Sequence, residues 1–229
     1  MSNNFYDNKL IKKPWGEEHV VYRDKKKLCV TLLKIKKNHS TSLHCHPNKK
    51  TGFIVVNGEA NIQLGLWKKD TYKFKAPSKL MIRTGLFHSI KSKSKPYLVA
   101  LEFETPVDKK DLVRFNDNYG RKFKNYEGKK NAFKIDSKDI RFNKPLEKKK
   151  NVFKFKDVIL EVITLRNLKE IKKFKMDNIF AVIKGNICNK SGKNILSSGD
   201  IIKTGTLKKL STRFKIKKYL TLLRVYKIN

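Results

Sequence analysis

Apolar and β-branched residues occur in short runs separated by Gly, Pro, Asn and Ser, without the long stripes of amphipathic helices. In the first half the runs are Leu28 to Ile35, Gly52 to Val56, Ala60 to Leu66, Thr71 to Lys75, Lys79 to Ile82 and Tyr97 to Phe103. Such runs, bounded by turn residues, are typical of β-strands. Their regular spacing predicts a sandwich or a small barrel.

The strand pattern is interrupted once and then returns. The charged segment Val107 to Lys130 predicts a short helix or loop, and the lysine-rich stretch Arg141 to Lys150 predicts a linker. Four further apolar runs follow: Val158 to Leu165, Ile179 to Ile183, Asp200 to Lys203 and Leu220 to Tyr226. The chain is therefore expected to be all-β throughout.

Two pairs of similar segments indicate an internal repeat. Phe53-Ile-Val-Val-Asn-Gly58 matches Phe180-Ala-Val-Ile-Lys-Gly185, and Ile82-Arg-Thr-Gly85 matches Ile202-Lys-Thr-Gly205. A repeat of this length predicts two copies of one small barrel. The expected domains are residues 1–140 and 151–229, joined by a linker at 141–150.

Composition indicates which partners and which cellular location to expect. The formal charge is +35, but the excess is almost all lysine scattered along the chain, with only eight arginines. Arginine is better suited than lysine to binding phosphates and bases through two hydrogen bonds, so nucleic acid is not the expected partner. Binding of an acidic polymer such as RNA stays a third, less favoured hypothesis. Three isolated cysteines, the lack of a signal-like N-terminus and the lack of a long apolar run predict a cytoplasmic protein without membrane association.

Three of the five histidines carry the strongest chemical signal. His44 and His46 form a His-x-His on a strand-like run, so both imidazoles point to one side and Cys45 points to the other. A third imidazole, from His88, could complete a site for a divalent metal. His19 and His39 follow no such pattern and are expected at the surface.

The second copy lacks this chemistry. The matched positions hold Ile171, Lys173, Asn178 and Lys208 in place of His44, His46, Thr51 and His88. Cationic and apolar side chains cannot hold a divalent cation, so residues 151–229 are expected to have a structural role. A retained anion site that uses Lys173 and Lys208 is the alternative.

These residues resemble the motifs of the cupin superfamily. The spacing of His44, His46, position 51 and Gly58 follows its first motif, and Arg83-x-Gly85-x-x-His88 follows its second. Roughly residues 10 to 125 are similar, more closely, to the cupin domain of type II mannose-6-phosphate isomerases. The matching stretches are Lys13-Pro-Trp-Gly16, Ser42-Leu-His-Cys-His46, Ile54-Val-Val-Asn-Gly58 and Asp111-Leu-Val-Arg-Phe-Asn-Asp-Asn-Tyr-Gly-Arg121.

The resemblance implies two tandem jelly-roll (double-stranded β-helix) barrels, with a metal in the first. His46 and His88 fall on ligand positions, and His44 suits the general cupin pattern. Thr51 replaces the usual glutamate ligand, and a hydroxyl binds a divalent ion weakly, which makes it a weak fourth position. Zinc is the first expectation, with Fe, Mn, Ni and Co as alternatives. The implied ligand is a phosphosugar or sugar nucleotide, and cupin barrels often form homodimers.

Isomerisation of a sugar phosphate needs a base beside the metal and a grip on the phosphate. Glu102 and Glu104 share one face of a strand-like run, which is either the barrel interior or a solvated outer face. Guanidinium geometry suits phosphate, so Arg121 is the first candidate for binding it, followed by Arg114 and Arg83. Tyr119 belongs to the same Tyr-Gly-Arg element.

Two functions follow from this pattern. The first is a metal-dependent sugar-phosphate isomerase of the mannose-6-phosphate isomerase type, active in carbohydrate or polysaccharide metabolism. The alternative is a non-catalytic bicupin that binds a sugar or sugar nucleotide, which Thr51 and the second copy both favour.

Overall fold

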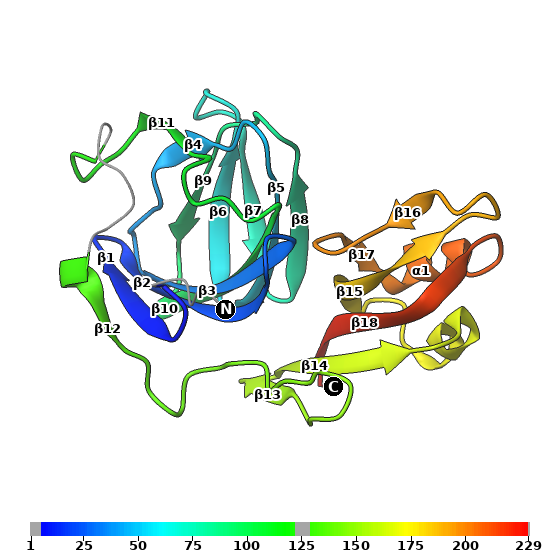
Figure 1. The fold of residues 1–229 in the computed structure, drawn as a ribbon. Helices are drawn as coiled ribbons and strands as arrows, with labels where there is room; N and C mark the ends of the chain where they lie inside the picture. The colour runs from blue at the N-terminus through cyan, green and yellow to red at the C-terminus, as the bar shows by residue number, and fades with distance from the viewer. Residues whose placement is uncertain (1–5, 122–128, 229) are drawn as a thin grey trace. The chain divides into compact units, whose positions relative to one another are not determined.

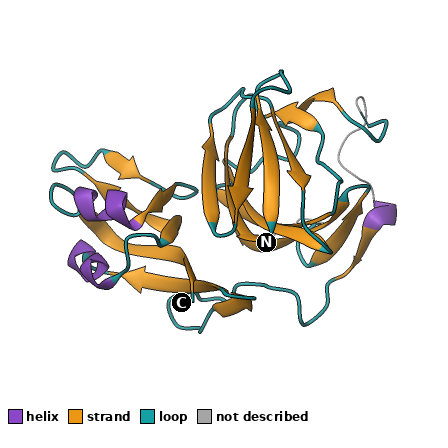
Figure 2. Cartoon of the chain, turned by 180° about the vertical axis from the view of Figure 1, so that it is seen from behind, coloured by secondary structure: helices purple, strands orange, loops and turns teal. Residues whose placement is uncertain are grey.

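The structure is a computed structural model that describes residues 6–121 and 129–228. The chain divides into two compact units. Unit 1 holds the described residues up to 78 and those from 82 to 141, and unit 2 holds residues 79–81 and those from 142 onward. Within the described ranges, strands predominate and helix is confined to three short segments, as Figure 2 shows. The predicted all-β class is confirmed.

The larger sheet of unit 1 has seven strands in the order β12-β1-β2-β3-β10-β5-β8. Its strands are β1 (Lys9–Lys13), β2 (Gly16–Asp24), β3 (Leu28–Lys36), β5 (Lys50–Asn57), β8 (Ser78–Ile82), β10 (Tyr97–Thr105) and β12 (Ala132–Lys134). A short 3-10 helix, η1 (Lys129–Asn131), precedes β12. The pairs β12–β1, β1–β2, β2–β3, β3–β10 and β10–β5 are antiparallel.

The smaller sheet of unit 1 has five strands in the order β11-β4-β9-β6-β7. They are β4 (Leu43–Cys45), β6 (Glu59–Leu64), β7 (Thr71–Lys75), β9 (His88–Ser92) and β11 (Val113–Asn116). The two sheets stand against each other in Figure 1, and the ring of Phe53 on β5 lies 5.9 Å from the ring of His88 on β9. Unit 1 is thus a jelly roll whose interior lies between β5 and β9.

Strand β10 sets which residues reach that interior. Glu102 pairs with Thr31 on β3 and with Phe53 on β5, while the next residue back, Leu101, pairs with Leu32 and Ile54. Successive side chains point to opposite faces of a strand, so Glu102 and Phe53 share the interior face. Leu101, Leu32 and Ile54 are fully buried on the other face, which explains why these strands are apolar almost without interruption.

Unit 2 contains one six-stranded sheet, in the order β13-β14-β18-β15-β16 with β17 also paired to β15. Its strands are β13 (Val152–Phe155), β14 (Val158–Leu165), β15 (Ile179–Cys188), β16 (Asn194–Leu196), β17 (Ile201–Lys203) and β18 (Lys215–Lys227). The 3-10 helix η2 (Leu168–Lys173) and the helix α1 (Thr204–Leu210) pack with this sheet. Within residues 142–228, these two helices cover the face of the sheet that a second sheet would cover in a complete barrel, because their residues Ile171 and Leu207 belong to the core on that face.

The predicted repeat is visible in the strand order. In unit 1 the run β3-β10-β5-β8 corresponds to β14-β18-β15-β17 in unit 2. Phe53 pairs with Glu102, and its counterpart Phe180 pairs with Arg224 in the same way. The segments that would match β4 and β9 are η2 and α1. The repeat therefore extends over one sheet and changes in the other.

The stretch 107–130 contains the strand β11 and the first residues of η1 in addition to loops, and residues 122–128 of it lie outside the described part. Strand β11 was not predicted there. In the stretch predicted as a linker, Phe142 and Leu146 are buried, and the ring of Phe142 stacks on that of Phe153 with 6.0 Å between the centroids. The linker and the domain boundaries stay a prediction. In the described part of the chain, helices are too short or too polar to cross a membrane.

Candidate metal centre

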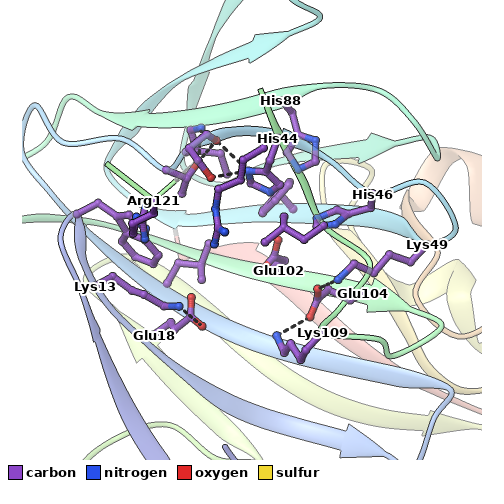
Figure 3. Close-up of a pocket in the computed structure, with 18 residues that line it drawn as sticks. Lys13, Glu18, His44, His46, Lys49, His88, Glu102, Glu104, Lys109 and Arg121 are labelled. Carbon is purple, nitrogen blue, oxygen red and sulfur yellow. Dashed lines mark hydrogen bonds and ion pairs between the residues drawn. The ribbon is translucent and has the colours of Figure 1, made fainter. Parts of the chain in front are cut away.

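Three histidines meet inside unit 1. His44 lies in β4, His46 follows it directly, and His88 opens the neighbouring strand β9 opposite His44. Their ring centroids are 4.5 Å apart for His44 and His88, 5.0 Å for His44 and His46, and 5.4 Å for His46 and His88. They line a cavity of about 80 Å³, which is room for several water molecules or an ion with part of its hydration shell. Figure 3 shows the three rings on one side of this cavity.

Backbone carbonyls fix which nitrogen of each ring carries its proton. Nδ1 of His44 lies 2.8 Å from the carbonyl oxygen of Ser42, Nδ1 of His46 lies 2.6 Å from that of Asp111, and Nδ1 of His88 lies 3.0 Å from that of Leu86. A carbonyl can only accept, so each Nδ1 donates a hydrogen and the Nε2 of the neutral ring keeps a lone pair. The buried Nε2 atoms of His46 and His88 have no hydrogen-bond partner among the described residues.

The surroundings keep the three imidazoles neutral. Burial lowers the pKa of His46 to about 3, helped by the positive charge of Lys49. Burial likewise lowers the pKa of His88 to about 4, and it holds the pKa of His44 well below the ordinary value together with the two neighbouring rings. Neutral imidazole is the form that binds a metal, so the site does not have to lose protons near neutral pH.

The donor set fits a divalent transition metal. The ligand atoms of His44, His46 and His88 all lie within 4.8 Å of one another, as do those of His46, Glu102 and Glu104. Buried nitrogen lone pairs without partners are costly, and coordination to a cation would satisfy them. Three imidazoles with open positions suit Zn, Fe, Mn, Ni or Co, and these residues would hold such an ion.

Glu104 is an ion-paired residue. Its two carboxylate oxygens accept hydrogen bonds from Lys49 and, at 2.9 Å, from Lys109, as Figure 3 shows. Burial opposes ionisation of this carboxyl, but the two lysines outweigh it and hold the pKa of Glu104 far below its usual range. The pKa of Lys109 is raised in turn, because the charge of Glu104 outweighs the effect of burial. A carboxylate held this firmly is a poor proton acceptor.

Glu102 is different, although it lies only two residues away on the same face of β10. Its carboxyl lines the cavity and forms no hydrogen bond or ion pair with the described residues. Burial raises the pKa of Glu102 to about 8, with a further contribution from the charge of Glu104. Of the two possibilities left open by the sequence, the barrel interior is therefore the one observed for both glutamates.

Thr51 does not line the cavity. It lies on β5 opposite Glu104, it is buried, and its hydroxyl has no hydrogen-bond partner among the described residues. Its role as a weak fourth metal ligand stays a prediction. The carboxylates nearest to the histidines come instead from the adjacent strand β10.

The predicted phosphate-binding residues separate into two groups. Arg114 and Arg121 line the cavity, and Arg121 is oriented by Asp117 through Nη2–Oδ1 and Nε–Oδ2 distances of 2.6 and 3.2 Å. Arg83 is exposed and lies away from the cavity lining. Tyr119 is also outside the lining, but its ring supports the Arg121 guanidinium at 5.2 Å.

Sequence reasoning missed four polar residues of the site. Lys13, Lys49 and Lys109 line the cavity, and Lys13 is paired with Glu18 at 3.4 Å. Asp111 orients His46 through its carbonyl, and its carboxylate accepts hydrogen bonds from the backbone of Asn48 and Lys49. The motif around Asp111 was recognised, but nothing in the pattern distinguished these lysines from the many others.

One histidine prediction was wrong. His19 is buried, not at the surface, and its Nε2 lies 2.9 Å from the carbonyl oxygen of Ile140. Burial lowers its pKa. It lies on β2, outside the cavity, and its surroundings are those of a structural residue.

The fold and the three-histidine centre define a protein of the cupin class. The family model described as "Mannose-6-phosphate isomerase C-terminal" matches residues 3–117, so the chain belongs to this family. No curated protein matches the chain.

Several solved structures are similar to part of the chain. CapF, a capsular polysaccharide assembling protein from Staphylococcus aureus, is 17% identical over 47% of this chain and 34% of its own, with a TM-score of 0.42. KdgF from Halomonas sp. is 13% identical over 46% of this chain and 94% of its own, with a TM-score of 0.40. A cupin-superfamily sugar phosphate isomerase from Silicibacter pomeroyi is 14% identical over 35% of this chain and 52% of its own, with a TM-score of 0.32. The chain thus spans about a third of CapF and half of that isomerase, and these likenesses concern the fold alone.

Proposed function

We propose that unit 1 is a metal-dependent sugar-phosphate isomerase of the mannose-6-phosphate isomerase type. The observation that carries the proposal is that three neutral imidazoles share a cavity with one carboxyl, Glu102, that forms no hydrogen bond or ion pair with the described residues. Family membership supports the substrate class. Cytoplasmic location and a homodimeric state are further expectations of the same proposal.

The cavity offers each group that such a reaction needs. An ion bound by His44, His46 and His88 would supply a Lewis acid that polarises the sugar oxygens. Glu102 takes the proton from the carbon beside the carbonyl and returns it to the carbonyl carbon, while the proton of the neighbouring hydroxyl moves to the carbonyl oxygen. The aldose thus becomes the ketose without a net change in protons. Glu102 must be ionised to accept this proton.

Cationic side chains would hold the phosphate. Arg121 and Arg114 line the cavity, and Arg121 is already oriented by Asp117. A guanidinium held in place loses little entropy when it binds a phosphate through two hydrogen bonds. Lys13 adds a buried positive charge to the same lining.

Interconversion of mannose 6-phosphate and fructose 6-phosphate by the metal-loaded protein tests the proposal. We expect turnover that His88→Ala abolishes together with metal binding, and that Glu102→Gln abolishes while metal binding persists. His39→Ala is the matched control, because His39 lies outside the cavity. Absence of turnover with each of Zn, Fe, Mn, Ni and Co would contradict the proposal.

The alternative is a non-catalytic unit that binds a sugar or sugar nucleotide. It is favoured by Thr51, whose neutral hydroxyl stands at the motif position where the resemblance to the isomerases leads one to expect a carboxylate ligand. This alternative predicts that sugar phosphates raise the melting temperature without being converted. Turnover that disappears in Glu102→Gln would exclude it.

A further inference from the structure

Unit 2 has a cavity of its own, of about 610 Å³. It opens on the sheet face that carries the apolar core of this unit, between β14, β18 and η2. Five of the lining side chains are charged or aromatic: Glu161, Glu170, Lys173, Phe174 and Arg224. The cavity is called the second cavity here.

Strand register relates the second cavity to the metal centre. Glu102 pairs with Phe53 and Thr31 in unit 1, and Arg224 pairs with Phe180 and Glu161 at the corresponding positions of unit 2. Arg224 therefore occupies the position of Glu102. Lys173 corresponds to His46 by its distance from the shared glycine, so two groups suited to a cation are replaced by two cations.

The Arg224 guanidinium is held in place by neighbours on several sides. It lies 3.9 Å from the ring centre of Tyr226 and 4.5 Å from that of Phe174. Its Nε donates to Asn178 Oδ1 at 2.7 Å, and its Nη1 donates to Glu161 Oε2 at 3.2 Å. Nη2 donates to none of the described residues, which leaves a pre-oriented donor at the second cavity.

The two glutamates that line the second cavity do not occupy the remaining donor of Arg224. Glu170 is engaged by the backbone, because its Oε1 accepts from the N–H groups of Arg166 and Asn167 at 3.2 Å each in a capping box for η2. Glu161 contacts one edge of the guanidinium only. The exposed Lys173, 5.4 Å above the Phe174 ring, supplies a second cation.

We infer that the second cavity binds a small oxyanion, a phosphate or a carboxylate, between Arg224 and Lys173. Guanidinium and ammonium groups bind such oxygens through charge-assisted hydrogen bonds. This site lies wholly within unit 2 and does not depend on the isomerase proposal for unit 1.

Calorimetric titration of the full chain tests the inference. A background that carries Arg114→Gln and Arg121→Gln separates it from unit 1, because these two arginines line the unit 1 cavity and would hold a phosphate there. Inorganic phosphate, mannose 6-phosphate and acetate are the probes. Saturable binding of any of the three is expected, and comparison of phosphate with acetate tells which oxyanion the site prefers. Arg224→Gln should weaken binding by about tenfold or more, because a charge-assisted hydrogen bond is lost.

Two further variants keep the test decisive. Lys173→Gln changes an exposed side chain and should weaken binding several-fold without affecting the fold, whatever Arg224→Gln does to stability. Arg213→Gln is the matched control, since Arg213 is an exposed arginine of unit 2 outside the cavity lining, and it should leave binding unchanged. No saturable binding, or binding that Arg213→Gln weakens as much as Lys173→Gln does, would overturn the inference.

Discussion

Units 1 and 2 share a run of four strands but differ in the segments that complete the interior. In unit 1 the strands β4 and β9 bring His44 and His88 face to face. In unit 2 the helices η2 and α1 stand there instead, and their apolar residues Ile171 and Leu207 are fully buried in the core. One sheet is thus a common scaffold that carries Glu102 in unit 1 and Arg224 in unit 2, whereas the other wall supplies histidines in unit 1 and apolar side chains in unit 2.

The comparison also explains why the polar residues of unit 1 are functional candidates. A buried imidazole without a hydrogen-bond partner on Nε2 is costly, and among the described residues His46 and His88 are of this kind. Unit 2 has no imidazole at the matched positions, which hold Lys173 and Lys208. Unit 1 thus keeps a costly arrangement that the shared strands do not require.

The largest expected effect comes from replacing His46 by lysine, the residue found at the matched position 173 of unit 2. His46→Lys should abolish stoichiometric metal binding, because an ammonium group replaces a neutral ligand beside Lys49 and repels the cation. Elemental analysis after dialysis against each metal measures this. His39→Lys should bind metal like the unchanged protein, and retention of metal by His46→Lys would break the comparison.

Glu104→Gln tests the ion cluster that unit 2 lacks. The change leaves Lys49 and Lys109 buried without their shared carboxylate, and the Lys49 side chain is only 3% exposed. We expect the free energy of unfolding to fall by about 3–5 kcal/mol. Urea unfolding with Glu59→Gln as control gives the value, and a loss below about 1 kcal/mol would indicate that the lysines find other partners.

Ile171→Ala tests the core that replaces the metal centre. Ile171 is fully buried in the cluster formed with Leu207 and Phe180, so its truncation leaves a void. The expected loss is about 3 kcal/mol of unfolding free energy in unit 2, with no change in metal affinity. Measuring both quantities on one preparation is essential, because an altered metal affinity would mean that the units are not independent.

Asp111→Ala tests how His46 is positioned. The variant removes the carboxylate that fixes the backbone of Asn48 and Lys49, while the carbonyl that accepts from His46 remains. Metal affinity should fall by about 10- to 100-fold, as is usual when a group that orients a ligand is lost. Competition with a chromophoric chelator measures the change, and Asp108→Ala is the control in the same loop.

A further effect is one of pH on the metal-free protein. The pKa of His88 is lowered to about 4 and that of His46 to about 3, whereas both are near 6.5 when unfolded. Between these values the two histidines bind more protons in the unfolded chain than in the folded chain, so their contribution to the unfolding free energy should decrease as pH falls from about 6.5 towards 4. The raised pKa of Glu102 contributes with the opposite sign. The slope should be smaller in His88→Ala, and an equal slope would show that other groups dominate.

The sequence predicted the strands that carry apolar runs, and β7 and β14 match these runs residue for residue, whereas more polar strands such as β1, β2 and β13 were not predicted. The histidines were identifiable because alternation on a strand brings His44 and His46 to one face. The helices η2 and α1 were not predicted, because a repeat alignment transfers strands from one copy to the other. Lys49 and Lys109 were not distinguishable among so many lysines, since their burial depends on Glu104, which is distant in sequence from Lys49.

The loop that follows β10 contacts both the glutamates and the histidines of the candidate metal centre. Lys109 donates a hydrogen bond to Glu104, which is close to Glu102 on the same strand. Two residues later, the carbonyl of Asp111 accepts a hydrogen bond from His46, and its carboxylate accepts one from the backbone of Lys49. A single proteolytic cut between 107 and 112 should therefore weaken both the proposed metal binding and the proposed proton transfer. For the same reason, a substitution in this loop that changes the orientation of His46 should also change the surroundings of Glu102.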